Sequence, residues 1–343
     1  MSEFAWAETL AAVASGTSLD TETAHAAMRE IMSGEATAAQ IAAFIVGLRM
    51  KGETVEEMSG LVRGMREAAV TVDLGSDWIL DIVGTGGDRS GTFNISTTAA
   101  FIAAGAGARV AKHGNRSMSS KCGSADVLEG LGVAVDLDPD ANRRLFADTG
   151  FAFFLAPVYH PAMRFAGPVR RELGIPTVFN FLGPLSNPAG ANSYAIGVSD
   201  GSMAERMIRV LAQSGATRAF VYYGEDGLDE LTITGPSFIW RLLDGEITHA
   251  EFTPEDFGVK RSPLETILGG EVDENVAIIR DILSGAAGPK RDVAVINAAA
   301  GLVAAGLAGG FGDGAELARA VIDDGRAMAK LEQVAARSVE LRA

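Results

Sequence analysis

From Trp78 onward, short apolar runs alternate with segments of helical periodicity, and this alternation limits the chain to an α/β architecture. The run 78–83 is apolar and ends at the glycine-rich Gly84–Gly87, which predicts a buried strand that opens into a loop. Further strands are expected at 109–111, 133–137, 151–155, 194–198 and 219–223, with helices at 97–105, 125–131 and 139–148. Because strands joined through helices pair in parallel, the sequence predicts a largely parallel central sheet.

The second half of the chain extends this scheme. A meander at the sheet edge is expected from three extended runs, at 231–234, 238–242 and 247–252. From Asn275 onward the chain is mostly helical. Its longest apolar run, Val293–Gly310, is rich in Ala and Gly and contains Asn297, which is typical of a buried helix rather than a membrane span.

The first 70 residues predict helices alone. Thr37 with Gln40, and Thr54 with Glu57, are capping-box pairs, and each precedes apolar residues at helical spacing. Asp20 is placed to cap a further helix, and Trp6 opens a fourth. The sequence therefore predicts a helical domain over residues 1–72, joined by helices around 165–186, and an α/β domain over 73–343.

Charge and cysteine content narrow the class of protein. The formal net charge is −15, which disfavours broad nucleic-acid binding because that function needs a basic face. The chain has one cysteine, Cys122, and its N-terminus carries Glu3 and Glu8 without a basic cluster, which indicates neither a disulfide framework nor a signal peptide. We expect a cytoplasmic protein with no nucleic-acid or membrane partner, and any anion site must concentrate positive charge locally.

A glycine-rich loop follows the first predicted strand and leads into a helix. It reads Asp81-Ile-Val-Gly-Thr-Gly-Gly-Asp88, and Thr92-Phe-Asn-Ile-Ser-Thr97 follows at the helix start. Glycines let backbone N–H groups approach a phosphate, and a helix N-terminus favours an anion. The loop lacks the third glycine of a dinucleotide fingerprint and the Gly-Lys-Ser/Thr of a P-loop. By itself it also fits a plain strand-to-helix turn capped by Ser and Thr.

Positive charge gathers in the segment Lys112-His-Gly-Asn-Arg-Ser-Met-Ser-Ser-Lys-Cys-Gly-Ser-Ala-Asp126. Lys112, Arg116 and Lys121 lie within ten residues and are interleaved with serines. Cationic side chains, hydroxyls and glycine N–H groups together suit a pyrophosphate. The alternative is a solvated, charged surface loop.

Two shorter motifs carry further chemistry. Arg170 and Arg171 follow His160, and an arginine fork binds a carboxylate in bidentate fashion, although an exposed helix with an acid-paired Arg171 would give the same pattern. Asp229 and Glu230 are adjacent carboxylates, which suit Mg²⁺ when substrate phosphates supply the remaining ligands. An acidic turn is the alternative there.

Taken together and in this order, these segments resemble the anthranilate phosphoribosyltransferases over nearly the whole chain, including Asn180-Phe-Leu-Gly-Pro-Leu-Ser-Asn-Pro188. The resemblance implies a homodimer of the nucleoside phosphorylase/phosphoribosyltransferase fold, with the active site between the helical and α/β domains. It implies transfer of the phosphoribosyl group of 5-phosphoribosyl 1-pyrophosphate (PRPP) to anthranilate, the second step of tryptophan biosynthesis from chorismate. Mg²⁺ is the implied cofactor, with two ions per site. Cys122 stands where this family commonly has Ser.

The resemblance also assigns site residues. PRPP would be bound by Gly84, Gly87, Asp88, Thr92, Asn94, Ile95, Ser96, Thr97, Lys112, His113, Gly114, Asn115, Arg116, Ser117, Met118, Ser119, Ser120 and Ser124. Anthranilate would be bound by Gly84, Asn115, Arg170, His113 and His160, and Mg²⁺ by Ser96, Asp229 and Glu230. No nucleophile or general base is expected, because the attacking aromatic amine is already neutral. Lys112 and Arg170 would act by positioning and by charge stabilisation.

Three other functions stay open. A pyrimidine nucleoside phosphorylase shares the expected fold, but it needs neither a metal–pyrophosphate site nor a carboxylate clamp. A phosphoribosyltransferase for another aromatic amine or acid would differ only in pocket side chains. A regulatory protein could bind PRPP without turnover, although every assigned ligand is present in this sequence.

Overall fold

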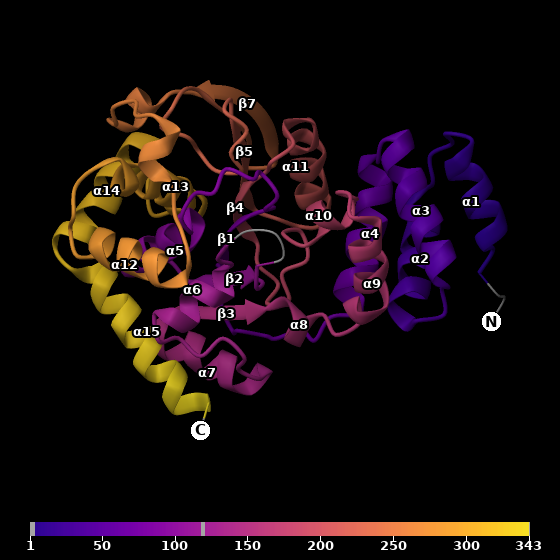
Figure 1. Ribbon diagram of the computed structural model, residues 1–343, viewed down its shortest axis with the longest axis horizontal. Helices are drawn as coiled ribbons and strands as arrows, with labels where there is room; N and C mark the ends of the chain where they lie inside the picture. The colour runs from indigo at the N-terminus through magenta and orange to yellow at the C-terminus, as the bar shows by residue number, and fades with distance from the viewer. Residues whose placement is uncertain (1–3, 118–120, 343) are drawn as a thin grey trace.

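A computed structural model describes residues 4–117 and 121–342 of the chain. Figure 1 shows a lobe of helices at one end of the molecule, beginning with the indigo N-terminal segment, and a larger lobe built around a sheet at the other end. The helical lobe opens with α1 (Trp6–Ala14), α2 (Thr21–Ser33), α3 (Ala38–Lys51) and α4 (Val55–Glu67).

Side-chain caps define the starts of three of these helices. Asp20 accepts a hydrogen bond of 2.7 Å from the backbone N–H of Thr23 at the start of α2. The predicted capping boxes of Thr37 and Thr54 are both formed, at the starts of α3 and α4. The apolar residues that follow them are buried, including Phe44 and Leu61. The predicted helices of this lobe are therefore confirmed.

The chain returns to the helical lobe after the third strand. Helix α8 (Ala156–Tyr159) leads into α9 (Met163–Leu173), which packs against α2 and α3. Helix α10 (Phe179–Leu182) follows and contacts α4. Figure 1 shows α9 beside the N-terminal helices, far in sequence from them.

The larger lobe contains a seven-stranded sheet of order β3-β2-β1-β4-β5-β6-β7. Its strands are β1 (Leu80–Gly84), β2 (Val110–Gly114), β3 (Phe151–Leu155), β4 (Ser193–Gly197), β5 (Arg218–Gly224), β6 (Ser237–Leu243) and β7 (Glu246–Phe252). The first five pair in parallel, and β6 and β7 add an antiparallel edge. The predicted, mostly parallel sheet is confirmed.

The sheet opens between β1 and β2. These strands share a single registered pair, Leu80 with Val110, whereas β1 pairs with β4 over its full length. Side chains fill the gap: Asp81 Oδ1 accepts from His113 N at 3.2 Å, and Lys112 Nζ donates to Ile82 O at 2.6 Å. Strand order also reverses at β1, and such a switch point forms a ligand crevice at the carboxyl ends of the strands.

Helices cover both faces of the sheet. One face packs against α5 (Ile95–Gly105), α6 (Ser124–Gly130), α13 (Pro289–Ala304), α14 (Phe311–Asp323) and α15 (Arg326–Arg342). Helix α12 (Val272–Leu283) contacts α6 and α5, and α7 (Pro139–Thr149) contacts β3. Short 3₁₀ turns span Gly201–Met203, Pro254–Phe257 and Leu264–Ile267. The other face packs against α11 (Ala204–Gln213) in a core that continues into the helical lobe. The helical lobe therefore shares a hydrophobic core with this face of the sheet, and the opposite face has a core of its own.

Two predicted strands are wrong. Residues 133–137 form no strand: this apolar run is buried, but Ala134 N donates to Ser338 Oγ at 2.9 Å, so its backbone is tied to α15 and not to a sheet. Residues 231–234 also form no strand, because Asn297 on α13 binds both the N–H and the carbonyl of Leu231 at 2.9 Å.

Strand β1 and helix α13 lie close to their predicted positions. Strand β1 begins at Leu80, two residues after the expected start, and Trp78 is half exposed. The run Val293–Gly310 supplies most of buried helix α13, as predicted. Within the described residues, none of the helices is both long enough and apolar enough to cross a membrane.

Candidate active site

The glycine loop after β1 is shaped by left-handed backbone. Gly86, Gly87 and Gly91 have φ values of 71°, 88° and 71°, and Arg89 adopts 58°, a conformation that is uncommon for a residue with a side chain. The loop is tied to a distant segment, because Gly86 N donates to Asp229 Oδ2 at 2.6 Å. The two motifs separated by about 140 residues in sequence thus meet at the carboxyl end of β1.

Asp229 and Glu230 lie in an irregular segment that crosses the ends of β1 and β4. Gly84 and Gly197 make this crossing feasible, because a Cβ on either would overlap Asp229. Both carboxylates are buried, and Glu230 Oε1 accepts from Ser96 N at 3.1 Å, at the start of α5. The structure therefore brings together the three residues assigned to Mg²⁺.

The electrostatics of this pair favour a cation. Burial, together with the nearby carboxylates of Asp88 and Glu230, raises the pKa of Asp229 well above its usual range. Burial likewise raises the pKa of Glu230 to about 8, although the Lys112 ammonium lowers it in part. Glu230 Oε2 is buried and has no hydrogen-bond partner in the described part of the chain. A bound divalent cation would relieve both effects.

The donor set also fits Mg²⁺ specifically. Two carboxylates and a serine hydroxyl are hard oxygen ligands, and Mg²⁺ binds proteins through one or two carboxylates plus substrate phosphates. Among residues 4–117 and 121–342, no group of three or more His, Cys, Asp or Glu side chains could hold a metal unaided. The site thus suits an ion that arrives with a phosphorylated ligand.

Lys112 lies beneath these carboxylates. Its ammonium is almost fully buried and donates to Ile82 O at 2.6 Å and to Ser96 Oγ at 3.3 Å. Burial lowers the pKa of Lys112 to about 8, while the charges of Asp81, Glu230 and Asp229 oppose that effect. In this arrangement Lys112 neutralises the acidic cluster and orients Ser96, so direct contact with pyrophosphate stays a prediction.

The N-terminus of α5 faces the same region. Asn94 is its N-cap residue but makes no side-chain cap bond, and the Thr97 hydroxyl is buried without a partner among the described residues. Ile95 is buried in the core, so only its backbone could serve a ligand. Before the helix, Asp88 is bound by the Ser90 hydroxyl at 2.6 Å, which lies 3.3 Å from that of Thr92. The Ser96 N–H is already bound by Glu230, so binding of a phosphate at this helix start stays a prediction.

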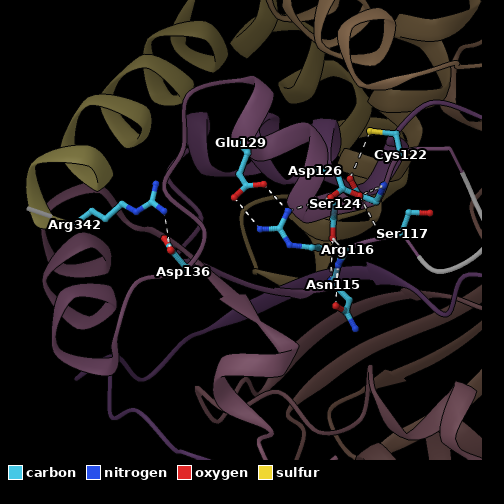
Figure 2. A network of polar contacts seen from close by, with 10 residues as sticks. Asn115, Arg116, Ser117, Cys122, Ser124, Asp126, Glu129, Asp136 and Arg342 are labelled. Carbon is cyan, nitrogen blue, oxygen red and sulfur yellow. Dashed lines mark hydrogen bonds and ion pairs between the residues drawn. The ribbon is translucent and has the colours of Figure 1, made fainter. Parts of the chain in front are cut away.

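The second of the predicted phosphate-binding motifs runs from the end of β2 to α6, and Figure 2 shows several of its side chains. Asp126 binds the backbone N–H groups of Ser117 and Gly123, each at 2.9 Å, and the Ser124 hydroxyl lies 3.2 Å from the carbonyl of Asn115. The motif is therefore folded back on itself around the start of α6. Met118, Ser119 and Ser120 lie outside the described residues.

The Arg116 side chain is directed toward α6 (Figure 2). Its guanidinium binds both carboxylate oxygens of Glu129, at 2.5 and 2.9 Å, and Asp126 at 3.3 Å. Half of this side chain is exposed, so the pair contributes modestly to stability. A PRPP contact by the Arg116 guanidinium would require it to leave these carboxylates; the assignment stays a prediction.

His113 and His160 form a buried pair with ring centroids 5.1 Å apart. Burial lowers the pKa of His113 to about 3, with a further contribution from His160, and burial lowers the pKa of His160 to about 4. Both rings are therefore neutral near pH 7. One nitrogen of His113 lies 3.2 Å from Gly183 O, His160 binds the Ser186 backbone, and both Nε2 atoms lack partners within the described residues.

Arg170 is a guanidinium without a carboxylate. It lies on α9, half buried, with its Cζ 5.3 Å from the centre of the Phe179 ring. In the described structure no ion pair or side-chain hydrogen bond engages it, and burial lowers its pKa. The segment 179–186 thus touches Arg170, His113 and His160, which gathers an aromatic ring, a cation and two neutral acceptors. That combination suits an aromatic carboxylate.

Sequence reasoning missed several residues that shape this site. Gly197 permits the crossing of Asp229, and Asn297 anchors the residue after Glu230. Asn187 donates to Asp81 Oδ2 and to Ala111 O, both at 2.8 Å, and so connects β1, β2 and segment 179–186. Asn187 lies inside a motif that the resemblance includes, but none of these residues carries a local pattern that reveals its long-range partner.

Comparisons with known proteins agree with this geometry. Residues 76–328 match the family model described as glycosyl transferase family, a/b domain, and residues 7–69 match the helical bundle domain of the same family. The anthranilate phosphoribosyltransferase of Moorella thermoacetica is 52% identical over 94% of this chain and 96% of its own length. That of Roseiflexus castenholzii is 53% identical over 93% of this chain and 94% of its own.

Solved structures are also similar. The anthranilate phosphoribosyltransferase of Thermus thermophilus superposes with a TM-score of 0.92 at 42% identity, covering 98% of this chain and 99% of that one. The enzyme of Saccharomyces cerevisiae in complex with PRPP and Mg gives a TM-score of 0.90 at 28% identity, covering 99% of each chain. The yeast enzyme in complex with 4-fluoroanthranilate gives 0.87 at 27% identity, covering 98% of this chain and 99% of that one. The chain therefore belongs to the anthranilate phosphoribosyltransferase family.

Proposed function

We propose that this protein transfers the phosphoribosyl group of PRPP to anthranilate, giving N-(5-phosphoribosyl)anthranilate and pyrophosphate, in the second step of tryptophan biosynthesis from chorismate. The bond from the anomeric carbon to pyrophosphate breaks, a bond from that carbon to the anthranilate nitrogen forms, and the nitrogen releases a proton. The proposal rests on the combination of two features. A buried Asp229–Glu230 pair at the N-terminus of α5 suits a metal with a phosphorylated donor, and an unpaired, half-buried Arg170 beside an aromatic ring suits an aromatic carboxylate.

PRPP is bound by the two loops at the opening between β1 and β2. The backbone N–H groups of Gly87 and Asp88, the start of α5 and the segment from Lys112 to Ser124 supply the donors, because the N–H groups of Thr85 and Gly86 are already bound to Gly197 and Asp229. Lys112 acts from below, because its buried ammonium holds Ser96 in place and offsets the acidic cluster. These roles follow from the positions of the residues and from the preference of anions for helix N-termini.

Asp229, Glu230 and Ser96 would hold Mg²⁺, in two ions per site. The bound metal would supply positive charge for the pyrophosphate leaving group. The yeast relative's complex with PRPP and Mg supports the use of this metal.

Arg170 binds the carboxylate of anthranilate. Asn115, Gly84, His113 and His160 surround its ring and amine. Because His113 and His160 are neutral, their unpartnered Nε2 atoms are hydrogen-bond acceptors, which suits an amine and not a second carboxylate. The yeast complex with 4-fluoroanthranilate supports an aromatic acceptor of this kind.

The organisation of the chain completes the proposal. The chain is divided into a helical domain over residues 1–72, joined by helices around 165–186, and an α/β domain over 73–343. The protein acts as a homodimer in the cytoplasm. Light scattering on the purified protein tests the oligomeric state.

The decisive experiment mixes protein, PRPP, Mg²⁺ and anthranilate and follows the loss of anthranilate fluorescence. Loss that requires both PRPP and Mg²⁺ supports the proposal, and no loss beside an active control enzyme overturns it. Thymidine or uridine with inorganic phosphate, offered in parallel, tests the nucleoside phosphorylase alternative.

A further inference from the structure

We propose that Asn275 is a positioning residue for PRPP. Its buried carboxamide fixes the orientation of Asn94, and Asn94 in turn holds the two PRPP loops at a fixed distance from each other. The inference rests on the proposed function, because it assumes that these loops bind PRPP. Asn275 belongs to α12, about 180 residues beyond Asn94 in sequence.

The Asn275 side chain has a unique hydrogen-bonding orientation. It is 2% exposed, and its Oδ1 accepts from the backbone N–H of Gly270 at 2.8 Å. A backbone N–H can only donate, so the amide oxygen must face Gly270 and the NH₂ group must face away from it. That NH₂ group donates to Asn94 Oδ1 at 3.0 Å.

Asn94 is fixed in the same way at its other end. Its Nδ2 donates to the carbonyl oxygen of Cys122 at 3.1 Å, and a carbonyl can only accept. A chain of hydrogen bonds, here called the relay, runs from Gly270 N–H through the side chains of Asn275 and Asn94 to the carbonyl of Cys122. The backbone group at each end determines which way the adjacent amide must face. Asn94 therefore cannot flip its amide without breaking two bonds at once.

This relay joins the two phosphate-binding segments. Asn94 ends the glycine loop and occupies the N-cap position of α5, and Cys122 belongs to the loop between β2 and α6. The Cys122 thiol also interacts with the Asn275 side chain. Among the residues of these loops that the structure describes, no strand pairing joins the two, since the pairing of β1 with β2 is limited to Leu80 and Val110. Their spacing is accordingly set by side chains, and Asn275 supplies the bond that orients Asn94.

Backbone contacts place Asn275 for this role. The segment before α12 pairs with the end of the glycine loop, through an antiparallel bridge from Leu268 to Thr92 and a 2.9 Å hydrogen bond from Gly269 N to Gly91 O. A Cβ on Gly269 would collide with Asn275 Oδ1 and with the backbone of Phe93. The close approach at Gly269 thus carries Asn275 to Asn94, and the loop that contacts PRPP is supported from behind.

A double-mutant cycle tests the inference. The dissociation constant of PRPP with Mg²⁺ is measured by calorimetry for the wild type, Asn275→Ala, Asn94→Ala and the double variant. Loss of one buried, neutral hydrogen bond changes an equilibrium by about 5- to 10-fold, so Asn275→Ala is expected to weaken PRPP binding by that factor. Because Asn275 acts through Asn94, the double variant is expected to bind no more weakly than Asn94→Ala alone.

Asn142→Ala is the matched control. Asn142 lies on α7, is equally buried and donates to Phe153 O at 2.8 Å and to the Tyr159 hydroxyl at 2.6 Å, so its side-chain hydrogen bonds reach β3 and α8 and not the two loops. This variant is expected to lower the Tm and leave PRPP binding unchanged, and the KM for anthranilate at saturating PRPP is expected to change less than twofold in Asn275→Ala. If Asn275→Ala does not fold, Asn275→Ser, which keeps a hydroxyl, enters the same cycle.

Three results would overturn the inference: unchanged PRPP binding by the Asn275 variant, independent effects of Asn94 and Asn275, or an equal loss in Asn142→Ala. A wild-type protein that does not bind PRPP would instead overturn the proposed function. Calorimetry on the wild type separates the two failures before any variant is compared.

Discussion

Gly197 lies directly against the backbone of Asp229, so closely that a methyl group at position 197 would overlap the Asp229 carbonyl oxygen. Gly197→Ala is therefore expected to displace the segment that carries both acidic residues. Overpacking of this kind costs about 1–3 kcal/mol in the free energy of unfolding. We expect a lower Tm together with a higher Mg²⁺ concentration for half-maximal activity.

Gly167→Ala provides the comparison for this prediction. Gly167 lies inside α9, where an added Cβ meets nothing within 4 Å. The substitution is expected to leave the Mg²⁺ dependence unchanged, because Gly167 lies on α9 and an added Cβ there does not meet the segment that carries Asp229 and Glu230. An unchanged Mg²⁺ dependence in Gly197→Ala would show that the crossing at Gly197 does not control the acidic pair.

Arg170→Ala is expected to raise the KM for anthranilate while PRPP binding stays the same. A hydrogen bond to a charged group contributes about 1.5–3 kcal/mol, which corresponds to an increase of about tenfold or more. Arg171→Ala is the control, because Arg171 is the exposed neighbour on the same helix. Equal KM values for the two variants would remove Arg170 from the acceptor site.

Conversion of Asp229 and Glu230 to Asn and Gln is expected to separate activity from stability. Loss of a residue that only supports a metal ligand lowers activity by roughly 10- to 100-fold. Loss of the ligands themselves is expected to lower Mg²⁺-dependent turnover by at least that factor. The metal-free protein is expected to stay folded, because the amide oxygens of the two substituted side chains would still accept from the backbone N–H groups of Gly86 and Ser96. Activity titrated with Mg²⁺ and thermal unfolding in chelator check the two parts, and unaltered metal dependence would contradict the metal assignment.

His160 makes the stability of the fold depend on pH. Burial lowers its pKa from the usual 6.5 to about 4, so the unfolded chain takes up a proton below pH 6.5 while the folded chain does not. The contribution of neutral His160 to the free energy of unfolding is complete above pH 6.5. It is lost as the pH falls toward 4, at about 1.4 kcal/mol per pH unit. Urea unfolding of the wild type and His160→Gln at pH 7.5, 6.0 and 5.0 measures it. Parallel pH profiles for the two proteins would rule the contribution out.

Local patterns predicted much of the fold. The helix starts at Asp20, Thr37 and Thr54 were readable because a capping residue and its partner lie three residues apart. Strand β3 was placed with its observed limits. The two wrong strands failed for a tertiary reason: Ser338 and Asn297 bind their backbones from distant helices, and an apolar run shows burial without showing its hydrogen-bond partner.

The candidate site was predicted in part. The motifs around Gly84, Lys112 and Asp229 carry recognisable residue types, and the structure brings Ser96, Asp229 and Glu230 together. The supports behind them were not predictable from one sequence. Asn275 and Asn187 act on partners about 181 and 106 residues away, respectively, and a lone asparagine looks like any polar residue of a helix or loop.

The segment 179–186 is also held by the helical lobe, because Arg66 on α4 donates to the carbonyl of Leu185 at 2.6 Å. The proposed acceptor residues Arg170 and His160 therefore contact a segment that is anchored to both lobes, whereas Asp229 and Glu230 lie at the ends of the strands. Gly84, His113 and Asn115 are assigned to both substrates, so a change at the seam between the lobes is expected to alter the choice of acceptor without weakening PRPP binding only where it avoids these three residues.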